Sequence, residues 1–376
     1  MTSRRAFTHP RVLIVNPFGI GDTLFTTPLI RALRQAFPDS FLGYLCNRRA
    51  APVLRNNPHL NELYIYEKDE VVQLWRTSVW AWGRHVLGLL RRLRKARFDL
   101  AVDVSLGERY STILKWLGVR NRVGFDYRRR GRCLTASLPI TGYHDEHVVD
   151  YYRRLLRFLG IVMRTGDLEL HVAETDTRWA QEWLQVHGYD AGRCLVGIIP
   201  AGGVSWGVDA PFRRWSLEGF ARVADALVEA HDARIVLFGE RADSVMCQTV
   251  ASLMKHPALD VSGQTSLGQF VSLLGRLHLV ICNDGGPLHL AVSQGVKTVS
   301  IFGPVDPKVY GPYPHDDATH WVIRKEGLPC RPCYHRFKLP PCPYERACLT
   351  TIEPQEVFDA CRHILGGSLT GVAVTG

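Results

Sequence analysis

The sequence contains no long apolar run. No uninterrupted apolar stretch reaches the roughly 18 to 20 residues that a helix needs to cross a bilayer. The first apolar run, Val12–Val15, is cut short by Pro17, and no small-residue cleavage site follows it. We therefore expect a soluble, unexported protein that works in the cytoplasm.

Signatures for binding dinucleotides and nucleic acids are also missing. Gly19 and Gly21 follow the first apolar run, but the third glycine of a dinucleotide fingerprint would have to stand at position 24, which is Leu24. The oxidoreductase interpretation thereby loses its main support. The sequence has no zinc-finger or RNA-recognition signature either, so nucleic acid is not the expected partner despite a net charge of +10.

The excess positive charge is confined to the first half of the chain. Residues 1–180 contain 29 Lys and Arg against 17 Asp and Glu, whereas residues 181–376 contain 17 against 19. A field of this sign attracts phosphates, carboxylates or an acidic membrane surface. At 376 residues and 46% hydrophobic composition, the chain is long enough for two packed domains.

Apolar strand patterns alternate with helical patterns, which is typical of βαβ units. The predicted strands are residues 11–17, 41–46, 62–66, 98–105, 194–200, 234–239, 277–283 and 298–303, and the predicted helices include 23–37, 79–97 and 148–159. We predict an α/β protein with two doubly wound domains, residues 1–170 and 171–365, and a flexible tail at 366–376. The cleft between the domains is the default ligand site.

The segment FGIGDT connects the first strand to its helix. Backbone amides and the positive end of the helix dipole would face the crevice there. Asp22 has two interpretations: an N-cap that accepts amide hydrogen bonds, which spacing alone favours, or a carboxylate base at the cleft. The segment HDEH, residues 144–147, is interpreted as a helix start capped by Asp145 rather than as metal ligands.

Paired glycines follow two strands of the second half. In the segment NDGGPLH, Gly285 and Gly286 suit a diphosphate cradle, although an ordinary turn capped by Asp284 fits equally well. The segment PAGG is followed by FRRW, where Arg213 and its neighbour could hold a charged oxygen or form a surface ion pair. A lone histidine such as His289 is more often structural.

Three motifs in order give the sequence a resemblance to glycosyltransferase family 9, the lipopolysaccharide heptosyltransferases. They are RVLIVNPFGIGDTLFTTPLIRALR, then PAGG followed by FRRW, and finally CNDGGPLHLAVSQGVKTVSIFGPVDP. The resemblance covers almost the whole chain. It implies a GT-B architecture of two Rossmann-like domains facing across a cleft, and transfer of heptose from ADP-heptose to a lipopolysaccharide core or related anionic glycan.

The resemblance also implies residue roles. Asp22 would act as general base on the acceptor hydroxyl, Asp243 would reach the nucleoside, and Thr265 would contact the adenine. Arg213 stands where family members usually carry Lys and keeps the charge with a different geometry. The implied donor-binding residues are Gly202, Gly203, Asp243, Thr265, Asp284, Gly285, Gly286 and His289.

The chemistry of sugar transfer is consistent with these roles. A cation-like centre forms while a diphosphate leaves, so the catalyst needs a base on one face and anion stabilisation on the other. Asp22 would supply the base; the amides of Gly285 and Gly286, the helix end and Arg213 would stabilise the anion without a catalytic cofactor. A single displacement with one base predicts inversion at the anomeric carbon.

The acceptor is expected to bind the basic first half. We assign it to Gly21 and to the cluster Arg128, Arg129 and Arg130. The candidate helix 79–97 mixes Trp and Leu with Arg, a composition that suits an anionic membrane surface. A partly buried helix with a solvated basic face explains the same composition.

Ten cysteines in an unexported chain are not expected to form disulfides, because the cytosol keeps thiols reduced. Four of them lie within 19 residues: Cys330, Cys333, Cys342 and Cys348. Their number and spacing predict a closed structural site for zinc, with iron as the alternative ion. Reduced thiols in a loop are the competing interpretation.

Two other functions stay open at the level of sequence. A sugar-nucleotide epimerase on the same architecture would turn over the donor without any acceptor. A non-catalytic basic protein would bind glycolipid and transfer nothing.

Overall fold

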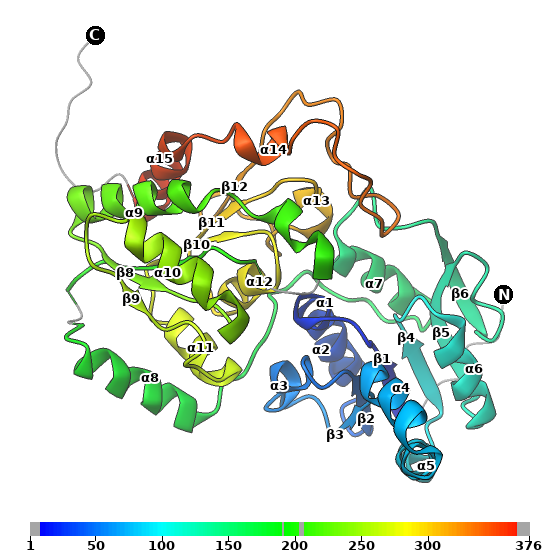
Figure 1. Cartoon of the computed structure of the whole chain (residues 1–376). Helices are drawn as coiled ribbons and strands as arrows, with labels where there is room; N and C mark the ends of the chain where they lie inside the picture. The colour runs from blue at the N-terminus through cyan, green and yellow to red at the C-terminus, as the bar shows by residue number, and fades with distance from the viewer. Residues whose placement is uncertain (1–7, 190–191, 203–206, 367–376) are drawn as a thin grey trace. The chain divides into compact units, whose positions relative to one another are not determined.

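The computed structural model describes residues 8–189, 192–202 and 207–366. The chain divides into two compact units: unit 1, Met1–His171, and unit 2, Val172–Gly376. Each unit contains one six-stranded sheet in which every strand pairing is parallel (Figure 1). The predicted tail beyond residue 366 lies outside the described residues.

The sheet of unit 1 has the order β3-β2-β1-β4-β5-β6. Its strands are β1 (Val12–Val15), β2 (Leu42–Cys46), β3 (Glu62–Ile65), β4 (Leu100–Asp103), β5 (Asn121–Tyr127) and β6 (Ala136–Ile140). Every residue of β1, β2 and β4 is buried, because helices cover both faces of a parallel sheet. The chain reverses its direction across the sheet between β1 and β4, so loops at their carboxyl ends border a crevice.

Seven helices of unit 1 are described: α1 (Ile20–Phe25), α2 (Thr27–Ala36), α3 (Ala51–Leu54), α4 (Lys68–Thr77), α5 (Val79–Ala96), α6 (Glu108–Trp116) and α7 (Val148–Arg157). Apolar residues of α5 and α6, among them Leu93 and Leu114, pack with Leu13 and Val15 of β1 in one core cluster. Helices α2 and α7 contact each other.

The single helix predicted over residues 23–37 is wrong, because the chain forms two helices that meet at Thr26. Pro28 lacks an N–H and would clash with the carbonyl four residues earlier in a continuous helix. The freed carbonyls find side-chain donors instead: the Thr26 hydroxyl donates to Thr23 O at 2.7 Å, and the Thr27 hydroxyl to Leu24 O at 2.7 Å.

The sheet of unit 2 has the order β12-β11-β10-β7-β8-β9. Its strands are β7 (Leu195–Ile199), β8 (Arg234–Leu237), β9 (Leu259–Asp260), β10 (Leu279–Asn283), β11 (Thr298–Ile301) and β12 (His320–Ile323). The chain reverses between β7 and β10, which are hydrogen-bonded neighbours. The loops after these two strands therefore lie side by side at the crevice of unit 2.

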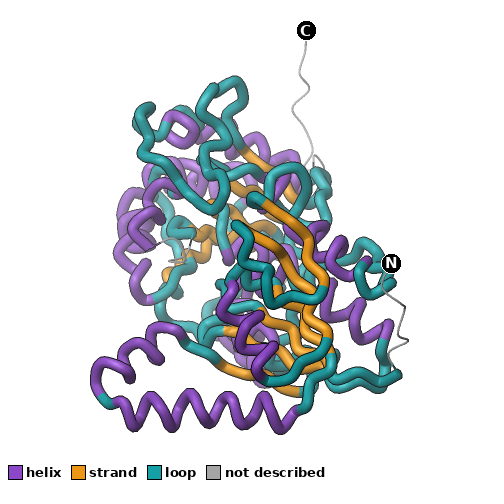
Figure 2. The backbone as a smooth tube through the Cα atoms, turned by 90° about the vertical axis from the view of Figure 1, so that its right-hand side faces the viewer, coloured by secondary structure: helices purple, strands orange, loops and turns teal. Residues whose placement is uncertain are grey.

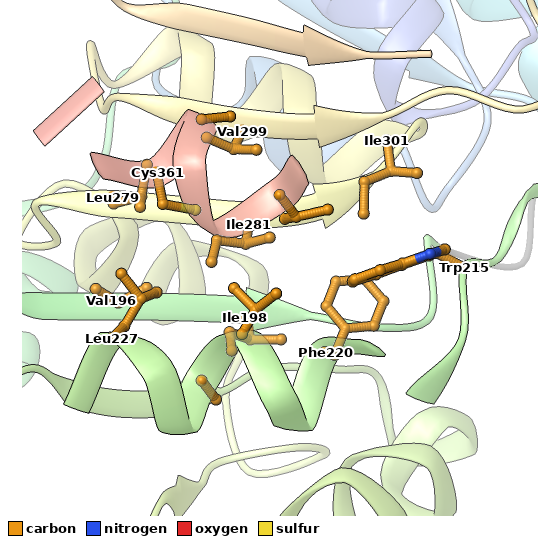
Figure 3. Packing of buried hydrophobic residues seen from close by; sticks show 14 of the residues in the cluster. Val196, Ile198, Trp215, Phe220, Leu227, Leu279, Ile281, Val299, Ile301 and Cys361 are labelled. Atoms are coloured by element: carbon orange, nitrogen blue, oxygen red, sulfur yellow. The ribbon is translucent and has the colours of Figure 1, made fainter. Parts of the chain in front are cut away.

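Helices cover both faces of the second sheet as well. They are α8 (Glu174–Val186), α9 (Leu217–His231), α10 (Ser244–Leu253), α11 (Leu267–Leu274), α12 (Gly286–Ser293), α13 (Pro307–Tyr310), α14 (Ala347–Thr350) and α15 (Pro354–Leu365), with 3-10 turns η1 (Gly207–Arg213) and η2 (Arg241–Asp243). Figure 3 shows side chains of β7, β10 and β11 packed with residues of α9 and α15, including Phe220 and Cys361. This core fixes the strand ends from which the site loops start.

No helix among the described residues is long and apolar enough to span a membrane.

Candidate active site

Two asparagines hold the loop that follows β1. The amide of Asn16 donates to Asp22 O at 3.1 Å, and its side-chain oxygen accepts the Phe18 N–H at 3.2 Å. The Asn47 amide donates to Pro17 O at 3.1 Å and to Phe18 O at 2.7 Å. The start of α1 is thus fixed at the carboxyl edge of the first sheet by buried or half-buried amides. Sequence reasoning assigned no role to either asparagine, although Asn16 stands inside the first motif.

Asp22 is the third residue of α1 and does not cap it. The N-cap is Gly19, which makes no side-chain hydrogen bond, so the capping interpretation is wrong. Asp22 is half-buried, as is Gly21 beside it. Burial and, second to it, the negative charge of Asp22 raise the pKa of Tyr143 well above its usual value, which places the two side chains near each other. Asp22 therefore lies half-buried at the carboxyl edge of the first sheet, near Tyr143.

The arginine cluster follows β5 at the same edge of the sheet. Arg128, Arg129 and Arg130 are all exposed, and the first two have left-handed backbone with φ of +54° and +60°. The Arg128 guanidinium lies 4.9 Å from the ring centroid of Tyr127. Because the carboxyl ends of all six parallel strands meet at one edge, these cations and Asp22 border the same side of unit 1.

The helix α7 is capped by His147, so the prediction that Asp145 caps it is wrong. The Nδ1 atom of His147 accepts the Val149 N–H at 3.2 Å, and the ring meets Phe25 edge-on at 4.9 Å.

Asn283 joins the three motif segments of unit 2. Its amide donates to Pro200 O at 2.6 Å, and its side-chain oxygen accepts the Trp215 N–H at 2.9 Å. Arg214 donates from Nε to Ala201 O at 2.9 Å. The end of β10, the PAGG loop and the FRRW segment are therefore bonded into one surface. Asn283 is fully buried and belongs to the last motif, but its linking role was not predicted.

Two glycines allow the loops after β7 and β10 to touch. Gly202 has a φ of +82°, a left-handed backbone conformation that residues other than Gly rarely adopt. A Cβ on Gly285 would lie 2.3 Å from the Gly202 carbonyl oxygen, so no side chain fits there. Gly203, the other glycine of the PAGG loop, lies outside the described residues.

A buried ion pair lies beside these loops. Nη2 of Arg213 and Oδ2 of Asp284 are 2.5 Å apart, with side chains 10% and 2% exposed. The predicted alternatives for both residues are wrong: the ion pair is not on the surface, and the N-cap of α12 is Gly285 rather than Asp284. Burial raises the pKa of Asp284, and the guanidinium of Arg213 opposes that shift. Pairing keeps both charges in an interior that would otherwise exclude them.

Helix α12 starts directly at this pair. Gly286 is its first residue and is half-buried, and His289 is buried in its first turn. The first amides of a helix lack intrahelical acceptors and favour anions. The structure thus brings Gly202, Arg213, Asp284, Gly285, Gly286 and His289 together within unit 2.

The two predicted nucleoside contacts lie after the neighbouring strands. Asp243 is buried, and its carboxylate accepts the Glu240 N–H at 3.1 Å to close the turn η2 after β8. Thr265 is half-buried and directly precedes Ser266, the N-cap of α11. Both follow strands on the β8 side of the crevice, and their roles toward a nucleoside stay predictions.

The four clustered cysteines line one cavity of about 390 Å³ in unit 2. All four are free thiols, and burial raises the pKa of Cys348 to about 11. Arg331 fastens the loop by donating to Gly303 O at 2.7 Å and to Val305 O at 3.2 Å. Throughout the described ranges, no group of three or more His, Cys, Asp or Glu side chains is placed to hold a metal ion. The predicted metal site stays a prediction.

Comparison with known proteins places this geometry in a family. The sequence model of "Glycosyltransferase family 9 (heptosyltransferase)" matches residues 86–339. Lipopolysaccharide heptosyltransferase 3 of Escherichia coli K12 is 23% identical over 83% of this chain and 88% of its own length. A family 9 glycosyltransferase from Veillonella parvula superposes with a TM-score of 0.81 at 24% identity, covering 97% of this chain and 100% of its own. The E. coli ADP-heptose lipopolysaccharide heptosyltransferase II superposes with 0.70 at 22% identity, covering 94% and 98%.

The predicted GT-B fold with two doubly wound domains is confirmed by these superpositions and by the two parallel sheets.

Proposed function

The chain belongs to glycosyltransferase family 9, and from that premise we propose that it is an inverting heptosyltransferase. It transfers heptose from ADP-heptose to a lipopolysaccharide core or a related anionic glycan. The solved relative named as an ADP-heptose heptosyltransferase supports this donor. An acceptor of this kind is a glycolipid, so the reaction takes place at the cytoplasmic face of a membrane.

One observation carries the donor half of the proposal: three motif segments of unit 2 are bonded together at the crevice of its sheet. Asn283 links the loops after β7 and β10 to the segment of Trp215. The ADP diphosphate binds over Gly202 and Gly285, where no side chain can block the backbone. Asp243 and Thr265, after the neighbouring strands, contact the nucleoside.

The stabilisation of the leaving diphosphate needs no metal ion in this account. The amides at the start of α12 face the phosphate, and charge that develops there meets fixed dipoles. Arg213 adds a positive charge beside the phosphate, although Asp284 offsets much of that charge. His289, in the first turn of α12, is assigned to the donor sugar and diphosphate.

The acceptor half of the proposal depends on Asp22. Its half-buried carboxylate takes the proton of the acceptor hydroxyl as that oxygen attacks the anomeric carbon. One base and one displacement give inversion of configuration. Gly21 and the exposed cluster Arg128, Arg129 and Arg130 bind the acceptor, with the guanidinium groups facing its acidic groups.

Mass spectrometry of products tests this function. The full chain is incubated with a panel of nucleotide sugars, each with and without a core glycolipid extract. We expect a heptose to be added to the lipid from ADP-heptose, and donor consumption to depend on the acceptor. Consumption of the donor at the same rate without lipid would support an epimerase instead, and no consumption of any donor would support a binding protein.

A second, structural proposal concerns the loop of Cys330, Cys333, Cys342 and Cys348. Four thiolates suit zinc or iron, and all four side chains line one cavity. The Arg346 N–H also donates to the sulfur of Cys342 at 3.3 Å. Because the thiols are not placed to hold an ion in this structure, binding requires them to turn toward one another.

Elemental analysis tests the metal proposal. We expect about one zinc or iron per chain, lost in the variant Cys330→Ser/Cys333→Ser and retained in the control Cys194→Ser, whose thiol lies outside the loop. A stoichiometry near zero in protein purified without chelators would contradict it.

A further inference from the structure

The helices α4 and α5 form a hairpin that turns at Ser78 (Figure 2). Trp75 of α4 and Trp82 of α5 link the two helices, with rings that meet edge-on at 4.8 Å. Leu93 and Ala96 attach the end of α5 to the core of unit 1. Arg92 is held at the flank, where its guanidinium bonds Glu62 at 2.7 Å. The rest of α5 is free to present its other face to its surroundings.

That outer face carries one continuous stripe. Its residues recur at intervals of four and three positions, which places them above one another on a helix. They are Trp80, Arg84, Leu87, Arg91 and Arg94. All five are exposed, and Trp80 reaches 90% of full exposure and Leu87 50%. Lys95 is exposed beside them. Together with Lys95, the stripe therefore combines two large apolar groups with four cations.

The face carries no negative charge. The 18 residues of α5 include neither Asp nor Glu. Near the tip of the hairpin, the apolar side chains of Val72, Trp75 and Val79 are exposed as well. Leaving a Trp and its apolar neighbours in water is costly, and a solvated helix surface normally alternates charges of both signs. Neither the packing of unit 1 nor its sheet explains this composition.

We propose that the outer face of α5 and the tip of the hairpin are a docking surface for an anionic phospholipid bilayer. Trp80, Leu87 and the apolar tip enter the interfacial layer, where an amphipathic indole is favoured. Arg84, Arg91, Arg94 and Lys95 pair with lipid phosphates. Charge complementarity favours this partner, because α5 offers cations next to apolar groups and contains no carboxylate that could pair with a basic protein.

Helix α7 of the same unit provides a matched control. Arg157 and Phe158 end helix α7, which packs with α2 and not with the core cluster of α5, and both are exposed. Phe158 is 49% exposed, close to the value for Leu87. A substitution there removes comparable apolar area or charge from unit 1 without touching the hairpin.

Vesicle sedimentation of the full chain, without any substrate, tests the proposal. We expect binding to phosphatidylglycerol–phosphatidylethanolamine vesicles, little binding to phosphatidylcholine, and loss of binding at high salt. Trp80→Ser/Leu87→Ser should weaken the partition coefficient about tenfold or more. Arg84→Gln/Arg91→Gln should weaken it by about an order of magnitude. Phe158→Ser and Arg157→Gln should leave it unchanged.

Three results would overturn the proposal. The first is absence of binding to the anionic vesicles, and the second is equal binding by the hairpin and control variants. The third is a change of oligomeric state in the hairpin variants, measured by light scattering. That change would assign the face to a second copy of the chain. Unchanged circular dichroism and ADP affinity establish that the variants fold. Because neither vesicles nor variants involve the sugar, failure here leaves the proposed transfer intact, and failure of transfer leaves docking intact.

Discussion

At the scale of single residues, the account assigns the proton transfer to Asp22. The sequence placed this residue at a strand-to-helix connection but favoured a cap. The structure rules out the cap, because the N-cap position falls on Gly19 three residues earlier. The linking amides of Asn16 and Asn283 were missed for a related reason: an asparagine gives no signal in sequence until its partners across the fold are known.

Asp22→Asn should abolish transfer and leave the donor site intact. The amide cannot take the acceptor proton, so we expect kcat to fall by at least about 100-fold. The affinity for ADP should stay within twofold, because the donor residues belong to unit 2. Steady-state transfer and calorimetric titration of ADP provide the two readouts, with the exposed Asp69→Asn as control. A variant that keeps wild-type kcat would remove Asp22 from the mechanism.

Asp103 at the end of β4 should make the stability of unit 1 depend on pH. Burial raises its pKa from 3.8 to about 6, and the Ser105 N–H donates to its carboxyl at 2.9 Å. Between these two values the folded state keeps a proton that the unfolded state releases. The contribution of protonated Asp103 to the free energy of unfolding is therefore present at pH 4 and is lost as the pH rises through about 6.

Asp103→Asn keeps the acceptor oxygen but cannot ionise. We expect the free energy of unfolding of this variant to exceed that of the wild type by about 3 kcal/mol at pH 7.5, and by much less at pH 4.5. Urea unfolding at both pH values measures this, and Asp69→Asn serves as control. An equal difference at the two pH values would mean that Asp103 does not titrate in this window.

At the scale of elements, all eight predicted strands exist, whereas β5, β6, β9 and β12 were not predicted. The eight include the central strands, which are buried on both faces and read as continuous apolar runs. The missed strands lie toward the sheet edges: β9 has two residues, and β6 is half-exposed. Edge strands mix polar and apolar residues, so their pattern is weak.

The close approach of two loops gives an element-scale prediction. A Cβ at position 285 would lie 2.3 Å from the Gly202 oxygen, and neither backbone can move freely. Gly285→Ala should therefore cost about 1–3 kcal/mol of stability and weaken ADP binding by about tenfold. At Gly275 the nearest atom would be 3.7 Å away, so Gly275→Ala should change neither. Equal effects of the two substitutions would mean that the contact between the loops does not matter for the donor.

At the scale of the whole molecule, the two units differ in charge as the proposed substrates require. The basic residues lie in the first half, where the acceptor and the docking surface are assigned, and the second half is close to neutral. The order of three motifs along one chain predicted both the fold and the family. Burial of the Arg213–Asp284 pair was not predictable, because nothing in the sequence shows that these two residues, which lie in separate segments, will meet.

The configuration of the product tests the central claim most directly. The full chain is supplied with ADP-heptose and a lipopolysaccharide core acceptor, and the new linkage is analysed by nuclear magnetic resonance. The account predicts one heptose added per acceptor, with an anomeric configuration opposite to that of the donor. A product that retains the donor configuration, or free heptose released with the acceptor unchanged, would contradict it.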